Sequence, residues 1–392
     1  MPPEERALWD ERLGRTRVPG GVDAWIHAAS MGEATAVGPL VRELSRVVPP
    51  PRFALTSMTR GGRERLAGLG PPARLAPLDS PQSARRFFAG VAPRRLFLLE
   101  TELWPQWLLR ARDLRVPVVV LSARLSERSL AGYGRLGAPF RSLVAGLAGV
   151  FCQSDADLGR WRELGARTEA SVVAGNLKDD GLPSAAPDRA AARAALGLEP
   201  GRPLLVLGSV RPGEVSVLAR AWRRLPPALR ERWQVVAVPR HPQASTSLRE
   251  EAARSGQAIS RDGTAPGGNW RWEDGLGVLN AFYAAADVAF VGGSLGPYGG
   301  HNPLEPAACG AAVLMGPYHA SQGDVVPALE SAGALRVVAS EAELANDLGR
   351  WLSDDTARAA AGRAALAVAE RRRGATARTV AQMVERGLWP AA

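Results

Sequence analysis

Short apolar runs alternate with longer amphipathic stretches along most of the chain. Runs of four to eight mostly apolar residues are typical of parallel strands that are buried on both faces, and the stretches between them have the spacing of helices. Repeated strand and helix units indicate an α/β fold built from doubly wound, Rossmann-like parallel sheets. The sequence predicts strands at residues 23–29, 52–57, 74–77, 96–99, 116–121, 150–153, 204–208, 234–238, 288–291, 313–315 and 335–338, and helices at 33–47, 341–352, 357–371 and 376–387.

The chain is long enough for two such domains. Its 392 residues exceed what one compact core usually holds. Pro, Ala and Asp dominate between residues 179 and 200, which marks a boundary. We therefore expect one domain at 1–182 and a second at 183–392, with a last helix that can cross back to the first. Two doubly wound sheets are expected to face a central cleft with their carboxyl ends, where ligands of such sheets bind.

A glycine-rich stretch follows the apolar run at 288–291. Glycines 292, 293, 296, 299 and 300 would let the backbone approach a ligand closely, and Pro303 is suited to the first turn of a helix. Free N–H groups at such a loop and helix start favour an anion. An ordinary strand-to-helix turn is the alternative, but His301, Asn302 and Glu305 add three polar groups that such a turn does not need.

Carboxylates follow two strands of the first half. Glu33 comes after the first strand, at the start of a helix, and Glu100 and Glu102 come directly after the strand at 96–99. An acidic residue in a first helical turn is often only a partner of the helix dipole. If Glu33 and Glu100 lie together, their repulsion and partial burial would raise a pKa and make one of them a general base.

Polar residues follow other strands as well. Arg124 lies after the fifth predicted strand, Arg211 lies shortly after Ser209 in the second half, and Arg240 precedes His241 at the end of another strand. Arginines at these positions can reach a phosphate or another anionic group. The histidines have no third ligand at a spacing that suits zinc, so no metal site is expected.

Composition and charge narrow the class of protein. A hydrophobic content of 46% and a charged content of 22% are ordinary for a soluble globular protein. The net charge of +10 favours an acidic partner, such as nucleic acid, an anionic membrane or a phosphorylated substrate. Cys152 and Cys309 lie in apolar contexts, which fits a reducing compartment. Because no apolar run reaches the roughly 18 residues of a membrane span, we expect a cytoplasmic protein that can touch a membrane surface.

Taken together, these segments resemble the 3-deoxy-D-manno-oct-2-ulosonic acid (Kdo) transferase family of lipopolysaccharide assembly, whose members are inverting glycosyltransferases of GT-B architecture. The resemblance runs from residue 9 to about residue 316. It rests on several motifs in the family's order, namely Trp9-Asp-Glu-Arg-Leu-Gly14, Ser30-Met-Gly-Glu33, Glu100-Thr-Glu-Leu-Trp-Pro105, Ala123-Arg-Leu-Ser126, Gly175-Asn-Leu-Lys178, Pro239-Arg-His-Pro242, Phe290-Val-Gly-Gly-Ser294 and Gly299-Gly-His-Asn-Pro-Leu-Glu305.

The resemblance implies a first domain that binds the acceptor and a second domain that binds a CMP-sugar. The donor would be CMP-Kdo and the acceptor a phosphorylated lipid A precursor, with no cofactor, metal or nucleic acid involved. Glu33 would be the general base, and Glu100 would assist at the acceptor. The donor-binding residues would be Ser209, Arg211, Arg240, His241, Gly293, Ser294, His301, Asn302 and Glu305, and the acceptor-binding residues Ser30, Gly32, Glu102, Arg124 and Lys178.

The chain departs from the family pattern in several places. Ser122 stands where the family has Asn, Val278 where it has the Glu of a Gly-Glu-Leu segment, and Val215 where it has a second acidic residue after Glu214. Family members also carry an apolar anchor before the segment that begins at Trp9. Either such an anchor was removed, or this chain binds the inner face of the inner membrane peripherally through basic and apolar surface.

Rival interpretations follow from these departures. One is a related GT-B transferase that uses a different nucleotide sugar or acceptor. Another is a nucleotide-sugar-binding protein that has lost catalysis, although the presence of Glu33 argues against it. Nucleic-acid binding, which the net charge alone suggests, has no recognition-helix or aromatic motif to support it.

Overall fold

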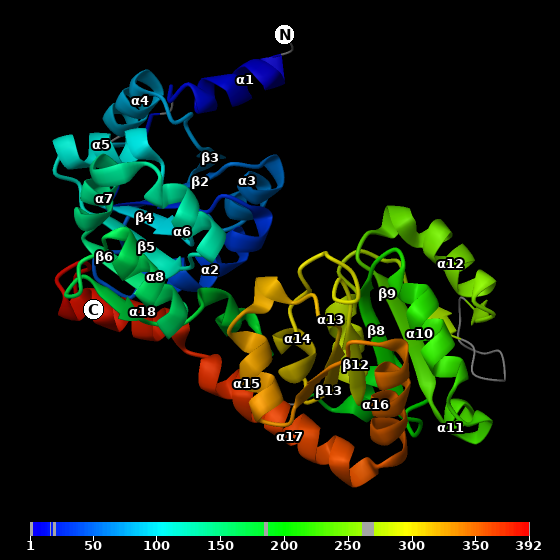
Figure 1. The fold of residues 1–392 in the computed structure, drawn as a ribbon. Coiled ribbons are helices and arrows are strands. Elements are labelled where there is room, and N and C mark those ends of the chain that lie inside the picture. The colour runs from blue at the N-terminus through cyan, green and yellow to red at the C-terminus, as the bar shows by residue number, and fades with distance from the viewer. Residues whose placement is uncertain (1–2, 16, 19–20, 184–186, 261–269, 392) are drawn as a thin grey trace. The chain divides into compact units, whose positions relative to one another are not determined.

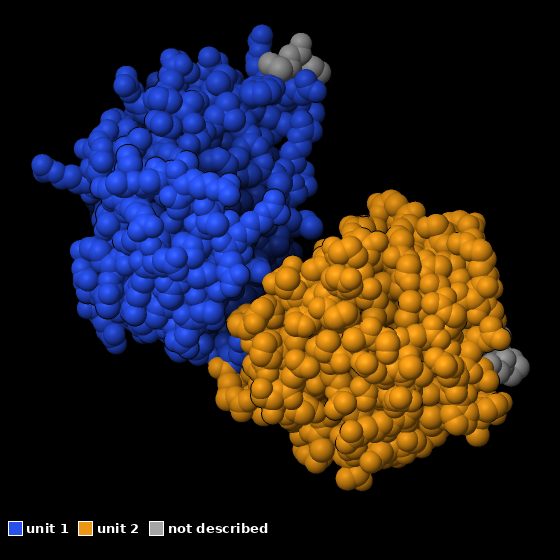
Figure 2. All heavy atoms as spheres, in the orientation of Figure 1, with its two compact units in different colours: residues 1–181, 372–392 blue, residues 182–371 orange. Residues whose placement is uncertain are grey.

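The computed structural model describes residues 3–15, 17–18, 21–183, 187–260 and 270–391. The chain divides into two compact units (Figure 2). Unit 1 consists of Met1–Gly181 and Arg372–Ala392, and unit 2 consists of Leu182–Arg371. Each unit is an α/β domain with its own parallel sheet, which confirms the predicted fold class.

Unit 1 holds a seven-stranded parallel sheet in the described part of the chain, with the order β3-β2-β1-β4-β5-β6-β7. Its strands are β1 (Ala24–His27), β2 (Phe53–Ser57), β3 (Ala73–Leu75), β4 (Leu96–Leu99), β5 (Val118–Ala123), β6 (Gly149–Cys152) and β7 (Ser171–Val173). Its helices are α1 (Pro3–Arg12), α2 (Met31–Leu44), α3 (Arg60–Ala67), α4 (Pro81–Val91), α5 (Pro105–Asp113), α6 (Glu127–Gly134), α7 (Gly137–Ala145), α8 (Asp155–Leu164), the 3₁₀ turn η1 (Leu177–Gly181) and α18 (Ala375–Glu385) (Figure 1).

Unit 2 also has seven parallel strands among its described residues, in the order β10-β11-β9-β8-β12-β13-β14. They are β8 (Leu204–Val210), β9 (Gln234–Pro239), β10 (Ile259–Ser260), β11 (Trp270–Trp272), β12 (Val288–Val291), β13 (Ala312–Met315) and β14 (Leu335–Val337). The helices are α9 (Arg189–Ala195), α10 (Glu214–Arg223), α11 (Pro227–Arg232), η2 (Pro242–Ala244), α12 (Ser245–Arg254), α13 (Leu279–Ala285), α14 (Leu304–Ala307), η3 (Ala320–Gln322), α15 (Val325–Ser331), α16 (Glu341–Ser353) and α17 (Asp355–Arg372) (Figure 1).

In each sheet the chain adds strands first on one side of a starting strand and then on its other side. The two strands that meet at this switch point are where ligand-binding residues are expected. In unit 1 the switch point lies between β1 and β4, which pair with His27 opposite Leu98. In unit 2 it lies between β8 and β12, which pair with Gly208 opposite Val291. Loops that leave such a pair diverge to opposite sides of the sheet, so ligands of doubly wound domains bind at the carboxyl ends of these strands.

The core of unit 1 explains why the chain returns to it. On one face of the sheet Trp25 packs against the rings of Phe87, Phe88 and Trp107, with centroids 4.5–5.4 Å away. The apolar cluster on strands β1, β2 and β4 with helix α2 includes Val380, Met383 and Trp389. The indole of Trp389 donates a hydrogen bond of 3.2 Å to the Leu44 carbonyl. The predicted division assigned 183–392 to the second domain with a last helix that can cross back to the first, and in the structure these apolar side chains place that helix, α18, in unit 1.

Two aspartates bind the segment that begins at Arg372 and leads into α18. Asp179 accepts a hydrogen bond of 2.8 Å from the Arg372 guanidinium, and Asp180 accepts from the N–H groups of Gly374, Ala375 and Thr376 at 2.6–3.2 Å. The Asp180 carboxylate therefore caps the N-terminus of α18, where the helix dipole favours negative charge.

Some elements differ from the expectation. Strands β7, β10 and β11, which have only two or three residues each, were not predicted. Helix α14, expected near Pro303, is a single turn, so its dipole is small. No helix in the described ranges is both long and apolar enough to cross a membrane.

Candidate active site

Glu33 lies after β1, in the first turn of α2. Ser30 is the N-cap of this helix: its Oγ accepts a hydrogen bond from the Glu33 N–H at 3.2 Å and donates to Glu33 Oε1 at 2.9 Å. Glu33 Oε2 accepts a further bond of 2.8 Å from the Ala29 N–H. This reciprocal capping fixes the carboxylate at the carboxyl edge of the sheet. Gly32, in the same turn, is exposed.

The environment of Glu33 raises the pKa of its carboxyl group. The residue is only 8% exposed. Burial, followed by the charge of Glu100, raises the pKa of Glu33 to about 7, and the hydrogen bonds from Ala29 and Ser30 only partly oppose this. A carboxylate that titrates near neutral pH can accept a proton from a hydroxyl and release it again, which is the requirement for a general base. Glu33 and Glu100 thus lie close enough for their charges to interact, as their positions after two strands predict.

Glu100 follows β4 in an unusual backbone conformation. Its φ is +59°, and Ser122, at the end of the neighbouring strand β5, has a φ of +52°. Non-glycine residues adopt the left-handed region at a cost in free energy, and such residues cluster at functional sites. The Glu100 carboxylate forms an ion pair with the ammonium of Lys178, the only lysine of the sequence. Two of the predicted site residues therefore bind each other.

A buried histidine, His27, contacts Glu102 and was not among the predicted site residues. His27 is fully buried at the end of β1, with Nδ1 2.9 Å from the Thr56 hydroxyl and Nε2 3.7 Å from Glu102 Oε2. Burial lowers the pKa of His27, although Glu102 opposes this. The indole of Trp104 donates to the same Glu102 oxygen at 2.9 Å. Glu102 is thus oriented by aromatic neighbours, and its charge also raises the pKa of Glu33. The only feature of the sequence that could have indicated this contact is the position of His27 at the end of a predicted strand.

Arg124 completes the carboxyl edge of unit 1. It directly follows β5, is half-buried, and its carbonyl accepts a hydrogen bond from the Thr101 hydroxyl in the loop after β4. The Ser122 hydroxyl lies 3.1 Å from Asn176 Oδ1 and accepts from the Leu177 N–H at 3.2 Å. These contacts join the loops after β4 and β5 to the turn that carries Lys178.

Unit 2 gathers two arginines and two histidines at the carboxyl edge of its sheet. Arg211 lies after β8, Arg240 and His241 after β9, and His301 in the glycine-rich loop after β12. Burial, together with the charges of Arg240, Arg211 and His241, lowers the pKa of His301 to about 4. His301 is therefore neutral at pH 7, and its buried Nε2 has no hydrogen-bond partner among the described residues. This edge favours an anion.

The glycine-rich loop differs from its predicted role. The N–H groups of Gly293, Ser294 and Leu295 do not point to free space, because all three donate to the carboxylate of Glu214 at 2.8 Å. The Ser294 hydroxyl, fully buried, donates to the Val291 carbonyl and accepts from the Gly316 N–H at 2.9 Å. The anion that occupies this cradle is a side chain of the protein itself. Glu214 was not among the site residues that the sequence predicted.

The remaining predicted residues lie around this loop. Ser209 is buried at the end of β8 with a φ of +55°. Asn302 Oδ1 accepts from the Leu304 N–H at 3.0 Å, which orders the start of α14. Burial raises the pKa of Glu305, and the charge of Arg240 opposes this. Val278, at the N-cap of α13, packs against the apolar cluster of Phe282 and its neighbours, so an apolar side chain fits its surroundings.

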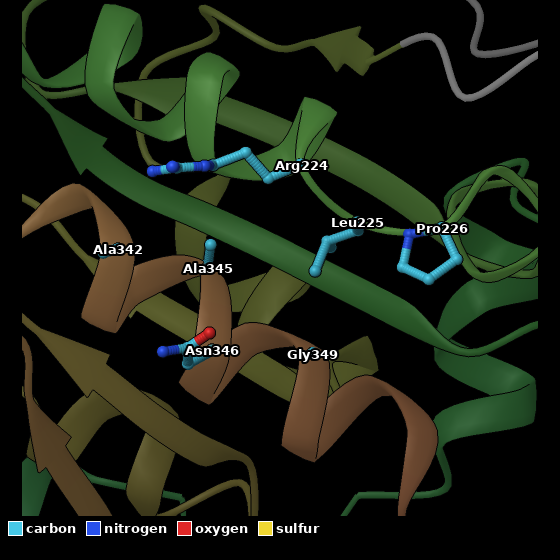
Figure 3. Close-up of a pocket in the computed structure, with 7 residues that line it drawn as sticks. All are labelled: Arg224, Leu225, Pro226, Ala342, Ala345, Asn346 and Gly349. Atoms are coloured by element: carbon cyan, nitrogen blue, oxygen red, sulfur yellow. The ribbon is translucent and has the colours of Figure 1, made fainter.

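A groove of about 420 Å³ lies on another part of unit 2 (Figure 3). It contains none of the predicted site residues and is lined by Arg224, Leu225, Pro226, Ala342, Ala345, Asn346 and Gly349. Its walls carry one charged side chain and no cluster of titratable groups. Among the described residues, no group of three or more His, Cys, Asp or Glu side chains is arranged to hold a metal ion.

Comparisons with known proteins agree with these features. A family model described as 3-deoxy-D-manno-octulosonic-acid transferase (kdotransferase) matches residues 7–181. A 3-deoxy-D-manno-octulosonic acid transferase of Bordetella pertussis is 36% identical over 382 residues, covering 93% of this chain and 88% of its own length. One of Chlamydophila psittaci is 33% identical over 338 residues, covering 82% and 75%.

A solved structure extends the comparison to the fold. The UDP-GlcNAc 2-epimerase of Neisseria meningitidis, in a structure bound to UDP-GlcNAc, has a TM-score of 0.64 at 13% identity and covers 92% of this chain and 99% of its own. At this identity the likeness shows the fold alone. Two Rossmann-like domains with parallel sheets constitute the GT-B fold.

Proposed function

The chain belongs to the 3-deoxy-D-manno-octulosonic acid transferase family, and on this premise we propose that it transfers Kdo from CMP-Kdo to a lipid A precursor in lipopolysaccharide assembly, with inversion at the anomeric carbon. Unit 1 binds the acceptor and unit 2 binds the donor. The observation that carries the proposal is the carboxylate of Glu33, whose pKa of about 7 suits a base that acts on a sugar hydroxyl at neutral pH.

Glu33 starts the proposed reaction. Its carboxylate removes the proton of an acceptor hydroxyl as the oxygen attacks the anomeric carbon of Kdo. The bond between that carbon and the CMP phosphate breaks, and CMP leaves with the electron pair. Glu100, paired with Lys178, and Glu102 orient acceptor hydroxyl groups, while Ser30 and Gly32 form the turn that holds Glu33. A single displacement needs one base and no covalent nucleophile, so it inverts the anomeric configuration.

Unit 2 stabilises the leaving group in this proposal. Negative charge grows on the CMP phosphate as the bond breaks, and the guanidinium groups of Arg211 and Arg240 lie at the edge where it would bind. His301 Nε2 and His241 add hydrogen-bonding groups, and Asn302 and Glu305 bind the sugar or base. Fixed cations can supply this stabilisation without a metal ion.

We further propose that the protein acts at the inner face of the inner membrane. The acceptor is an anionic lipid, and the net charge of +10 favours such a surface. Trp9 in α1 and Met31 at the start of α2 are 51% and 61% exposed, so both can contact acyl chains or head groups. Met31 lies in the same first turn of α2 as Glu33, so this contact would bring the lipid to the base.

The direct test is incubation of the full chain with freshly made CMP-Kdo and a tetraacylated lipid A precursor, followed by mass spectrometry. We expect a product that has gained Kdo, and the number of increments gives the number of residues added. Because Val278 replaces an acidic residue of the family pattern, parallel reactions contain UDP- and GDP-sugars in place of CMP-Kdo. Transfer from one of these, with none from CMP-Kdo, would replace the proposed donor.

The pH dependence of the reaction is expected to follow the pKa of Glu33. The base must be ionised, so kcat/KM for the acceptor should rise as the pH increases through about 7 and level off above it. The Glu100→Gln variant removes a negative charge that raises the pKa of Glu33, so its acidic limb should move to lower pH. Glu163→Gln, exposed on α8, is the control and should keep the wild-type profile. An unshifted limb in Glu100→Gln would show that another group titrates.

A further inference from the structure

The carboxylate of Glu214 fills the cradle formed by the glycine-rich loop. Oε1 accepts hydrogen bonds from the N–H groups of Ser294 and Leu295, and Oε2 accepts from those of Gly293 and Arg211, each at 2.8 Å. The side chain is only 1% exposed. Consecutive N–H groups that converge on one point make an anion-binding nest, and here all four donors are already used.

Two neighbouring glycines lie against other groups of the protein itself, Gly292 against Glu214 and Gly293 against His301. A Cβ at Gly292 would collide with the Ser209 carbonyl and lie 2.9 Å from Glu214 Oε2. Gly293 has a φ of +69°, and a Cβ there would lie 2.8 Å from the His301 ring. Both positions are buried. The close approach that requires glycine is thus an approach of the protein's own side chains to the loop.

The same carboxylate also places a cation. The N–H of Arg211 is held by Glu214, and the Arg211 guanidinium lies 4.4 Å from the centre of the Tyr298 ring, in the loop that Glu214 binds. Glu214 therefore connects β8 and β12 at the switch point and leaves Arg211, Arg240 and His301 beside a cradle that already contains a negative charge. A ligand phosphate can use these side chains, but the N–H groups of Gly293, Ser294 and Leu295 are already bound to Glu214.

We propose that Glu214 is a specificity-determining residue that reserves this site for a nucleotide donor with a single phosphate. A second phosphate, placed where the loop N–H groups would otherwise bind it, would have to displace Glu214 from four hydrogen bonds or lie next to its charge. A donor with one phosphate meets only the cationic side chains. The identity of the sugar rests on the proposed function. What this inference adds is that the bound nucleotide carries one phosphate and not two.

The test is isothermal titration of the full chain with CMP and with CDP. We expect wild-type protein to bind CMP more tightly than CDP by about tenfold or more. The Glu214→Gln variant loses the negative charge, so the preference for CMP should shrink by about fivefold or more, even where the loss of loop order weakens both affinities. Glu214→Asp keeps the charge and should keep the preference. Circular dichroism and thermal melts establish that each variant is folded.

A neighbouring carboxylate provides the matched control. Glu251, on α12, accepts hydrogen bonds from the N–H groups of Gly213 and Ser216 at 3.0 and 2.8 Å, so it anchors the same end of α10 from the side of α12. Glu251→Gln should preserve the ratio of the two dissociation constants. A purely structural role of Glu214 would lower the melting temperature and weaken both nucleotides equally, which would overturn the proposal.

Other outcomes separate this inference from the proposed function. Wild-type protein that binds CDP as tightly as CMP refutes the role of Glu214, even if Glu214→Gln does not fold. If CMP is preferred but no Kdo is transferred, the inference stands for a different CMP-sugar and the proposed reaction fails. If Kdo is transferred and the two nucleotides bind equally, only the inference fails.

Discussion

The Glu33→Gln variant is expected to lose about 10²–10⁴-fold in kcat, because the amide cannot take the proton of the acceptor hydroxyl. The amide is nearly isosteric: its oxygen can accept from the Ala29 N–H and its NH₂ group can donate to the Ser30 hydroxyl, so the turn should persist. The KM for the donor, which binds to unit 2 in our proposal, should change little. Steady-state kinetics with each substrate varied in turn measures both quantities.

Glu43→Gln is the matched control, since Glu43 lies on the same helix, α2, and pairs with the exposed guanidinium of Arg46. It should retain wild-type kcat. A Glu33→Gln enzyme with kcat within a few-fold of wild type, folded and saturable by both substrates, would mean that another group is the base.

Stability gives an independent check on the same residue. Folding raises the pKa of Glu33 from 4.5 to about 7, so the folded state holds this proton more tightly than the unfolded state. Stability from this group is therefore present below pH 4.5, falls as the pH rises, and is fully lost above 7, a difference of up to about 3 kcal/mol. Glu33→Gln removes the penalty, so it should be more stable than wild type in urea unfolding at pH 8 and show no such advantage at pH 4.

The sequence predicted the carboxylates that lie together in unit 1, but only some of the contacts around the glycine-rich loop of unit 2. Glu33 and Glu100 are far apart along the chain, yet both follow strands, and a parallel sheet brings strand ends to one edge. Their proximity and the raised pKa of Glu33 could therefore be predicted without coordinates. The pairing of Glu100 with Lys178 could not, because β7, the strand that precedes the turn with Lys178, was not predicted.

The glycine-rich loop shows why the spacing of glycines alone could not identify the group that the loop binds. Paired glycines indicate that something approaches the backbone closely, but they do not distinguish a ligand from a side chain. Glu214 lies 79 residues before Gly293 in the chain, and only the pairing of β8 with β12 brings the two segments together. Because that pairing is set by the fold, the partner of the loop was not visible in the linear sequence. The same reason applies to His27, whose contact with Glu102 depends on the pairing of β1 with β4.

Arg240→Ala is expected to weaken CMP binding by about 10–100-fold, the usual effect of removing a hydrogen bond between a charged side chain and a phosphate. Arg240 is exposed just after β9, and its charge lowers the pKa values of both His301 and Glu305, which places it electrostatically at the predicted phosphate site. Isothermal titration with CMP measures the affinity. Because phosphate charge grows as the bond to the sugar breaks, kcat/KM for CMP-Kdo should fall by more than the binding affinity for CMP-Kdo itself does.

Two further variants separate the effect of the Arg240 guanidinium at its position from the effect of net charge on CMP binding. Arg240→Lys keeps the charge but loses the planar fork, so it should recover only part of the affinity. Arg254→Ala, on an exposed arginine of α12 that pairs with Glu250, changes the net charge equally and should leave CMP binding intact. Removing the charge of Arg240 should also raise the pKa of His301 from about 4 towards its ordinary value, which an NMR titration of the imidazole can follow. If Arg240→Ala binds CMP like wild type while the pKa of His301 rises, Arg240 lies near the histidine but not on the phosphate, and the donor site must be assigned to other residues of this edge.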